Sequence, residues 1–218
     1  VQAAFSRMPF QVAYFHHAFA QRRVDQVIDR FRPDHVLCQL VRTTEYVRAR
    51  YTLPKTLDYM DTLSKGTERR TETAPFYLRP MWRTETRRLI AYENLMFDLF
   101  DNRVIISAQD RDYLYHPLRD RMAVIPNGVD VSALGAPAPF GEREPVLLFV
   151  GYLIERKGVR YLLEAAPAIL ARHPDLRIVL IGKGPEEQRL REQAEALGIA
   201  GSVTFVGFLP HAEVIEWM

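Results

Sequence analysis

The sequence is poor in the residues that support disulfides, thiolate metal clusters or membrane spans. Its 218 residues include a single cysteine, Cys38, which excludes an intramolecular disulfide and a thiolate cluster. Because Cys38 lies in the apolar run 35–41, we expect a buried structural thiol. No run approaches the roughly 20 apolar residues of a transmembrane helix, and no signal peptide is visible. The chain begins at Val1 rather than at a methionine, so a targeting segment could precede it.

Strong net charge and paired metal ligands are also missing. The formal net charge is +2 at pH 7, which argues against a nucleic-acid partner. His16 and His17 lie in the apolar, aromatic segment 12–19, and no second pair of ligands has the spacing of a zinc site. Packing is therefore the simpler role for these histidines. We expect neither a metal nor a bound cofactor.

What the second half does contain is a regular alternation of strand and helix patterns. The runs 145–150, 176–181 and 203–206 have strand patterns, and the run 176–181 is apolar without alternation, as in strands that are buried on both faces of a sheet. Helical patterns separate them, so we expect parallel βαβ units and an α/β fold. A glycine loop follows each run. Ligands of such sheets bind outside the carboxyl ends of the strands, where these loops lie.

The first of these loops has the strongest chemical signal. In the segment Phe149-Val-Gly-Tyr-Leu-Ile-Glu-Arg-Lys-Gly158, a strand ends in a glycine, and a cationic loop leads into a helix. Free backbone N–H groups and the positive end of a helix suit an anion, and Lys157 could neutralise a diphosphate as it leaves. The alternative is an ordinary βα loop with a solvated lysine.

Several short motifs occur in a specific order from about Val104 to the end of the chain. They are Asn127-Gly-Val-Asp130, Val150-Gly151, Lys157-Gly158, Gly182-x-Gly184-Pro185 and Val203-x-Phe-x-Gly207. The ordered set resembles family 4 glycosyltransferases. This resemblance implies the GT-B fold, in which two Rossmann-like domains face each other across a cleft. It also implies transfer of a sugar from a nucleotide donor, with retention at the anomeric carbon and without a metal.

The resemblance also suggests roles for individual residues. The loop from Gly151 to Gly158 would face the donor phosphates, with Lys157 as the phosphate cation. Family members often have an arginine where this chain has Tyr152, and Arg156 could compensate for its loss. The loops near the base would contribute Gly182, Gly184, Phe208 and Leu209.

The same resemblance predicts how the chain is divided. We expect an N-terminal acceptor-side domain over residues 1–131, a linker over 132–144 and a donor-binding domain over 145–218. Both domains would be incomplete. No counterpart of the family's downstream pair of glutamates can be placed, and the opening strand and glycine loop are also missing. We therefore interpret the chain as an internal piece of a longer enzyme that is inactive alone.

The first half again alternates strands and helices. Strand patterns cover residues 35–41, 55–60, 103–107 and 122–125, and helical patterns cover 22–31, 44–51, 83–100 and 109–115. In the long helix 83–100, the inward positions are Leu89, Met96, Phe97 and Phe100. This helix also carries Glu93, for which a satisfied structural carboxylate is the default expectation. The alternation predicts a second Rossmann-like domain.

Two aspartates, Asp58 and Asp61, lie at the carboxyl end of the second predicted strand. Many family members have a histidine near the position of Asp61. A carboxylate there could orient an acceptor hydroxyl or accept its proton. The alternative is that Asp61 or Ser64 caps the next helix. Ser107, at the end of the third strand, is a further candidate for a contact in the cleft.

The segment 76–82 has the composition of a membrane surface. It contains Phe76, Tyr77, Met81 and Trp82, and six arginines lie in and around it. Aromatic side chains with arginines suit anionic headgroups. The alternative is a solvated helical hairpin whose aromatic side chains pack on the core.

Together these features favour a retaining glycosyltransferase with a nucleotide-sugar donor and a glycan or lipid-linked acceptor. We expect the protein in the cytoplasm, either free or bound peripherally to the inner face of the membrane. Two alternatives stay open: a nucleotide-sugar epimerase of the same fold, and a non-catalytic relic that binds nucleotide-sugar.

Overall fold

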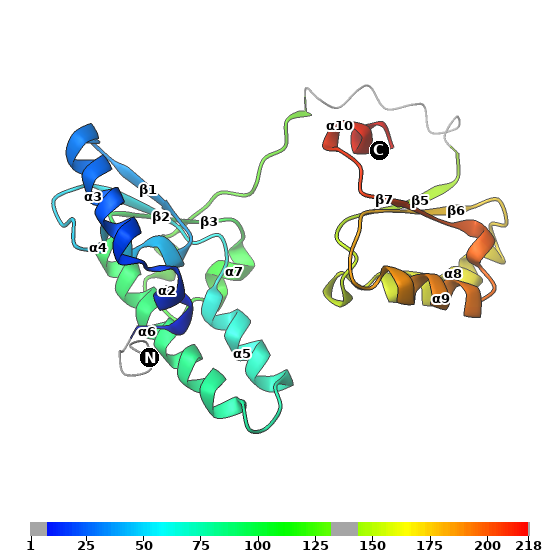
Figure 1. Cartoon of the computed structure of the whole chain (residues 1–218), viewed down its shortest axis with the longest axis horizontal. Helices are drawn as coiled ribbons and strands as arrows, with labels where there is room; N and C mark the ends of the chain where they lie inside the picture. Colours follow the sequence, from blue (N-terminus) through cyan, green and yellow to red (C-terminus); the bar gives the residue numbers. More distant parts are fainter. Residues whose placement is uncertain (1–7, 132–143, 218) are drawn as a thin grey trace. The chain divides into compact units, whose positions relative to one another are not determined.

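The computed structural model describes residues 8–131 and 144–217, which form two compact units (Figure 1). The units divide between Gly128 and Val129, and each is described by itself below. The predicted linker 132–144 lies outside the described residues except for Glu144.

The N-terminal unit is built on a parallel sheet in the order β1-β2-β3-β4. Its strands are β1 (Val36–Gln39), β2 (Lys55–Asp58), β3 (Asn102–Ile105) and β4 (Ala123–Val124). The α-helices are α2 (Phe10–Phe15), α3 (Ala18–Phe31), α4 (Glu45–Arg48), α5 (Leu63–Thr73), α6 (Arg79–Leu99) and α7 (Ala108–Tyr113). Short 3-10 turns cover η1 (Val41–Thr43) and η2 (Arg119–Arg121). The predicted alternation of strands and helices in this half is therefore confirmed.

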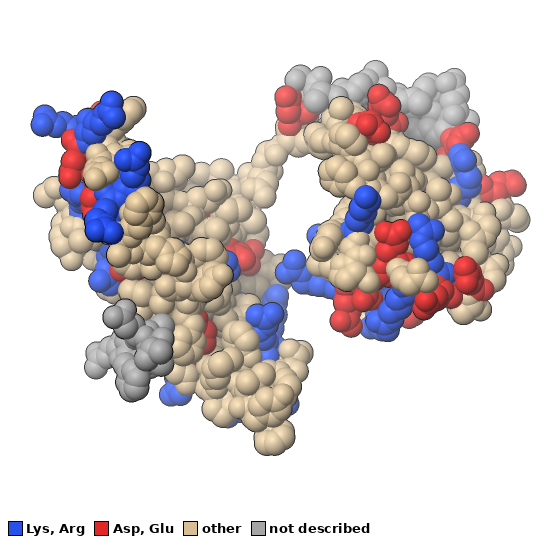
Figure 2. Space-filling model, in the orientation of Figure 1, with Lys and Arg blue, Asp and Glu red and all other residues tan. Residues whose placement is uncertain are grey.

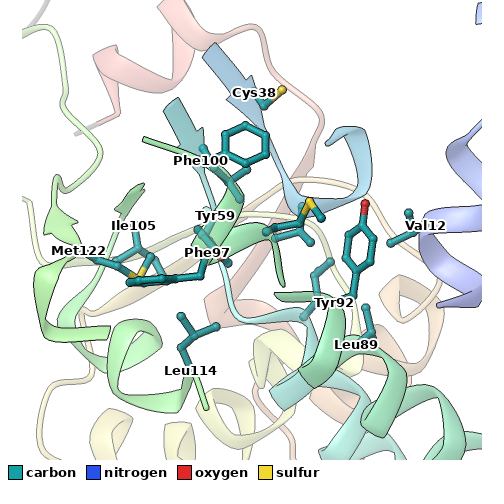
Figure 3. Close-up of a cluster of buried hydrophobic side chains, with 14 of the residues drawn as sticks. Val12, Cys38, Tyr59, Leu89, Tyr92, Phe97, Phe100, Ile105, Leu114 and Met122 are labelled. Carbon is teal, nitrogen blue, oxygen red and sulfur yellow. The ribbon is translucent and has the colours of Figure 1, made fainter. Parts of the chain in front are cut away.

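Helix α6 supplies much of the core of this unit. Its residues Leu89, Met96 and Phe97 are buried, and Phe100 follows them into the same cluster, as predicted (Figure 3). Apolar residues at these spacings lie on one helical face, which explains the burial. Cys38 is buried in the same cluster, and burial raises the pKa of its thiol to about 11. The thiol is therefore structural, as predicted.

Helices α5 and α6 pack together as an antiparallel hairpin (Figure 1). The hairpin itself was one of the two alternatives for this segment. Its aromatic side chains, however, do not pack on the core: Phe76 and Tyr77 at the turn are 81% and 67% exposed. The ring of Trp82 instead lies beneath the guanidinium of Arg70, at 4.9 Å. An apolar tip on the hairpin is the result.

The C-terminal unit has a parallel sheet in the order β5-β6-β7. Its strands are β5 (Val146–Val150), β6 (Arg177–Ile181) and β7 (Val203–Gly207). The helices are α8 (Val159–Leu170), α9 (Glu187–Ala196) and α10 (His211–Glu216), with 3-10 turns η5 (Glu155–Lys157) and η6 (Ala200–Ser202). All three strands coincide closely with the predicted ones.

Strand β6 is buried on both faces, as its unbroken apolar run predicts. Successive side chains of a strand point to opposite faces. Ile178 and Leu180 accordingly join the cluster formed with α8 and α9. Val179 and Ile181 pack on the other face with Val214 of α10. Helices therefore cover both faces of the sheet, and its strand ends are left for the loops (Figure 1).

Candidate functional site

Three loops meet at the carboxyl ends of β5, β6 and β7. Main-chain hydrogen bonds connect them: Gly151 N donates to Ile181 O at 2.9 Å, Leu153 N donates to Lys183 O at 2.9 Å, and Gly182 N donates to Gly207 O at 2.7 Å. We call the loops 151–158, 182–186 and 207–210 together the glycine edge. The sequence prediction that all three glycine loops lie on one edge of the sheet is confirmed.

Two glycines of this edge are required by close backbone contacts. A Cβ atom on Gly182, which has a φ of +142°, would lie 1.9 Å from the carbonyl oxygen of Gly151. A Cβ on Gly184 would lie 2.1 Å from the carbonyl oxygen of Leu153. No side chain fits at such distances, so the loops touch through their main chains alone.

The first loop ends in a cationic turn before α8. Residues 155–157 form η5, and Gly158 adopts the left-handed conformation, at a φ of 70°, from which α8 starts. Arg156 and Lys157 are exposed, and neither forms an ion pair with any residue that the structure describes. Two unpaired cations therefore lie next to the positive end of a 12-residue helix. Such an end binds anions, phosphate groups above all.

The other predicted residues of this edge differ in their exposure. Tyr152 and Phe208 present large exposed side chains. Leu209 instead packs against the cluster beneath α10, so its side chain belongs in part to the core. The sequence prediction did not select Lys183, which is exposed between Gly182 and Gly184. Its position inside the Gly182-x-Gly184 motif was the signal that could have identified it.

In the N-terminal unit, Asp58 has a structural role. Its carbonyl oxygen accepts a hydrogen bond from Leu40 N at 2.8 Å, and its Oδ1 accepts one from Met60 N at 3.1 Å. These contacts fix the end of β2 and the turn after it. Asp58 therefore helps to shape the loop that carries Asp61.

Asp61 is exposed at the surface and follows a strained residue, Met60, which has a φ of +58° although it is not a glycine. Its backbone amide donates to Tyr59 O at 2.7 Å. Partial burial of the carboxyl raises the pKa of Asp61, while the nearby Arg42 lowers it and Asp110 raises it. Arg42, from η1 at the end of β1, escaped the sequence prediction. Only the parallel pairing of β1 with β2 brings it near Asp61.

The alternative that Asp61 or Ser64 merely caps the next helix is wrong. The N-cap residue of α5 is Thr62, and its hydroxyl donates to Asp110 O at 2.6 Å. The Ser64 amide is bound by the carboxylate of Glu93, at 3.1 Å. A carboxylate from another helix thus takes the place of the local cap. The α5 amides are satisfied by a residue that no local sequence pattern identifies.

The third strand ends in a helix cap as well. Ser107 Oγ accepts a hydrogen bond from Asp110 N at 3.0 Å and donates one to Asp110 Oδ2 at 2.6 Å. The hydroxyl of Ser107 is therefore engaged in capping α7.

The side chain of His16 has partners within the protein. His16 Nε2 lies 3.1 Å from Gln21 Oε1, and the His16 ring packs against Tyr46. Over residues 8–131 and 144–217, no group of histidine, cysteine, aspartate and glutamate side chains is arranged to hold a metal ion. Within the same residues, no helix has the length and apolar character needed to cross a membrane.

Sequence comparison relates the second half of the chain to sugar-transferring enzymes. Residues 134–218 match the family model described as glycosyl transferases group 1. A phosphatidyl-myo-inositol mannosyltransferase of Mycolicibacterium smegmatis is 40% identical over 110 residues, which are 48% of this chain and 28% of the relative. A glycogen synthase of Mycobacterium tuberculosis is 30% identical over 138 residues, 60% of this chain and 32% of the relative. The chain thus spans about a third of the length of these curated relatives.

Solved structures extend the likeness of fold to both halves. The galactosyltransferase WaaB of the lipopolysaccharide outer core matches with a TM-score of 0.58 at 16% identity, over 91% of this chain and 50% of that one. Anabaena HepE in complex with UDP matches with a TM-score of 0.60 at 18% identity, over 88% of this chain and 53% of that one. These neighbours are GT-B glycosyltransferases, so the predicted fold class is confirmed. Residues 134–218 are thus similar in sequence to the group 1 glycosyltransferases, and the two units share the fold of such enzymes.

Proposed function

We propose that the protein moves a sugar from a nucleotide-sugar donor to a glycan or lipid-linked acceptor, with retention at the anomeric carbon. The observation that carries this proposal is the glycine edge. Backbone contacts hold its three loops together, and two unpaired cations lie beside the start of α8. We infer that these positive groups form an anion site. The family match of residues 134–218 and the UDP complex of a structural neighbour support it.

In this proposal, Lys157 and the N-terminus of α8 stabilise the departing nucleoside diphosphate. The bond between the anomeric carbon and the diphosphate oxygen breaks, and negative charge develops on that oxygen. Fixed cations and helix N–H groups that face this charge lower the barrier, often more than any other contribution. Arg156 supplies the second cation in place of Tyr152. These positive groups take the charge-neutralising role of a metal, so we propose that the reaction needs none.

The acceptor oxygen then forms a bond to the same face of the anomeric carbon, and its proton passes to the leaving phosphate oxygen. Atoms and charge balance without a further base. Asp61 orients the acceptor hydroxyl rather than reacting with it, because the phosphate takes the proton. Gly182, Gly184 and Phe208 lie on the side of the nucleotide base. The close main-chain contacts at the two glycines hold this part of the edge together, and Phe208 offers an exposed ring on which a base could stack.

Membrane binding is a second proposal, and it rests on the exposed tip of the α5–α6 hairpin. Phe76 and Tyr77 are exposed at this tip, and Arg79 and Arg83 on α6 are exposed as well. In Figure 2 the end of the hairpin is mostly tan, and blue Lys and Arg side chains lie elsewhere on the same unit. Apolar rings that enter the headgroup region, next to arginines that pair with anionic lipids, are typical of peripheral binding. We propose that the protein docks through this tip on the inner face of an anionic membrane. That position suits a lipid-linked acceptor.

The decisive experiment measures nucleoside diphosphate release by the complete gene product that carries this chain. UDP-, GDP- and ADP-sugars are offered with and without an extract of cell glycans and lipids. The Lys157→Ala variant is measured in parallel. Arg172→Ala is a matched control, because Arg172 is an exposed cation near the opposite end of the same helix.

Each outcome has a distinct meaning. Release that requires the extract, occurs with one donor and is lost only in Lys157→Ala supports sugar transfer and identifies the donor. Conversion of the donor without an acceptor would instead identify an epimerase. No reaction with any donor by a folded protein would reject the proposal in favour of a binding protein.

A further inference from the structure

One residue of α6, Glu93, holds both ends of the loop that carries Asp61. Before the loop, the hydroxyl of Tyr59 donates to the backbone carbonyl of Glu93 at 2.8 Å. After it, the amide of Ser64 donates to Oε1 of Glu93 at 3.1 Å. Residues 60–63 span these two anchors and are called the Asp61 loop below. Because one residue bears both anchors, the position of the loop depends on α6.

The carboxyl of Glu93 is buried and only partly satisfied. The residue is 0% exposed, and Oε2 finds no hydrogen-bond partner among the described residues. The hydroxyl oxygen of Ser64 is likewise buried and lacks a partner within the described part of the chain. The satisfied carboxylate that the sequence predicts is therefore found at Oε1 but not at Oε2. Burying a carboxyl that is only partly hydrogen-bonded costs free energy. The position of the Glu93 carboxyl at the start of α5 therefore points to a functional role that offsets this cost.

The loop itself is held in a conformation that it would not adopt alone. Met60 has a φ of +58°, and a non-glycine residue keeps this conformation only where its surroundings impose it. The Thr62 hydroxyl, bound to Asp110 O at 2.6 Å, provides a third anchor. Strained backbone of this kind clusters at functional sites, because it fixes a side chain in one position.

We propose that Glu93 is a positioning residue for Asp61, and that the charge of its carboxyl controls the Asp61 loop. The charged form attracts the first-turn amides of α5 and repels Asp61, whereas the neutral form does neither. This inference rests on the proposed function only in assigning the loop to the acceptor.

The surroundings of Glu93 raise its pKa, so that this change of charge falls near physiological pH. Burial is the main cause that raises the pKa of Glu93 to about 7; the nearby Ser64 and the Leu63 amide oppose the rise, and the charge of Asp61 adds a smaller one. Tyr59 also faces this carboxyl, and Arg103 and Asp98 act on Tyr59 in turn. We therefore expect Glu93 to exchange its proton near neutral pH.

The test compares Glu93→Gln with Glu85→Gln. Glu85 lies on the same helix, is 1% exposed, and accepts amide hydrogen bonds from Phe10 at 2.8 Å and Gln11 at 3.0 Å at the start of α2. The two variants therefore replace equally buried carboxyls of the same helix, but only Glu93→Gln changes a group that contacts the Asp61 loop. Both are isosteric, and circular dichroism checks that they fold.

Two measurements are made. In the full chain, the amide chemical shift of Ser64 is followed by NMR from pH 4 to pH 9, which needs no turnover. We expect it to titrate well above the ordinary glutamate range in wild type and in Glu85→Gln, and not in Glu93→Gln. In the complete gene product, we expect Glu93→Gln to lower kcat/KM for the acceptor by roughly tenfold or more, to leave the donor KM unchanged and to flatten the pH profile.

The proposal is overturned if the Ser64 amide titrates only in the ordinary glutamate range, or if the two variants have equal effects on the acceptor kinetics. A protein without transferase activity would reject the proposed function alone, because the NMR titration still decides the role of Glu93.

Discussion

An ideal Cβ atom on Gly182 would lie 1.9 Å from the carbonyl oxygen of Gly151. Atoms at that distance overlap, and the φ of +142° at Gly182 is itself unfavourable for any other residue. We expect Gly182→Ala to lower the free energy of unfolding by at least about 2 kcal/mol. Gly201→Ala should have little effect, because a Cβ there meets open space. Urea unfolding of both variants checks this, and equal stability would show that the loops do not pack as described.

Lys157 should affect the chemical step more than donor affinity. Its charge counts most when the diphosphate leaves, so we expect Lys157→Ala to lower kcat by about 100-fold. Arg156→Ala should instead raise the donor KM if Arg156 replaces the missing arginine at Tyr152. Steady-state kinetics with the identified donor separate the two effects. Unchanged donor affinity in Arg156→Ala would rule out that compensation.

The two aspartates after β2 should respond differently to substitution. We expect Asp61→Asn to lower acceptor turnover by about tenfold or more with little change in stability, since no described side chain depends on that carboxylate for a hydrogen bond. Asp58→Ala should lower the free energy of unfolding by about 1 kcal/mol, because Met60 N loses its acceptor. Turnover and urea unfolding are measured for each. Undiminished turnover in Asp61→Asn would remove Asp61 from the acceptor site.

The stability of the protein should depend on pH through Glu93. The pKa of Glu93 is about 7 in the folded protein against 4.5 for the unconstrained group, so the folded state holds this proton more tightly. The contribution to stability is therefore fully present below pH 4.5 and is lost as the pH rises through 7. Relative to Glu93→Gln, wild type should lose at most about 3 kcal/mol between these limits. Urea unfolding at pH 4.5, 6 and 8 measures the difference, and parallel curves for the two proteins would contradict the raised pKa.

The hairpin tip should bind anionic vesicles. Replacing both Phe76 and Tyr77 by serine should weaken binding to phosphatidylglycerol vesicles about tenfold, because both rings lose their place in the headgroup layer. Tyr51→Ser is the control, since Tyr51 is equally exposed but lies outside the hairpin. Co-sedimentation at low and high salt measures the binding. Failure of the wild-type protein to sediment with the vesicles would end the membrane proposal.

The sequence predicted the elements whose signals are local. Helix α6 and strand β6 were found because apolar residues recur along them at the spacing of their buried faces. Helix α5 was expected after Asp61 but without bounds, since most of its residues are polar and its first turn is held by Glu93, 29 positions away. Arg42 was missed for the same reason: its proximity to Asp61 exists only once β1 pairs with β2. The glycines were found by their order, but the backbone contacts that require them are visible only in the fold.

The glycine edge is assembled from main-chain atoms, and this affects how the protein could diversify. Its hydrogen bonds join Gly151 to Ile181, Leu153 to Lys183 and Gly182 to Gly207 through amides and carbonyls alone. The exposed side chains on it, those of Tyr152, Lys183 and Phe208, take no part in that assembly. We therefore expect exchanges at these three positions to leave the scaffold folded, so that under the proposed function they are where donor preference could change by point mutation.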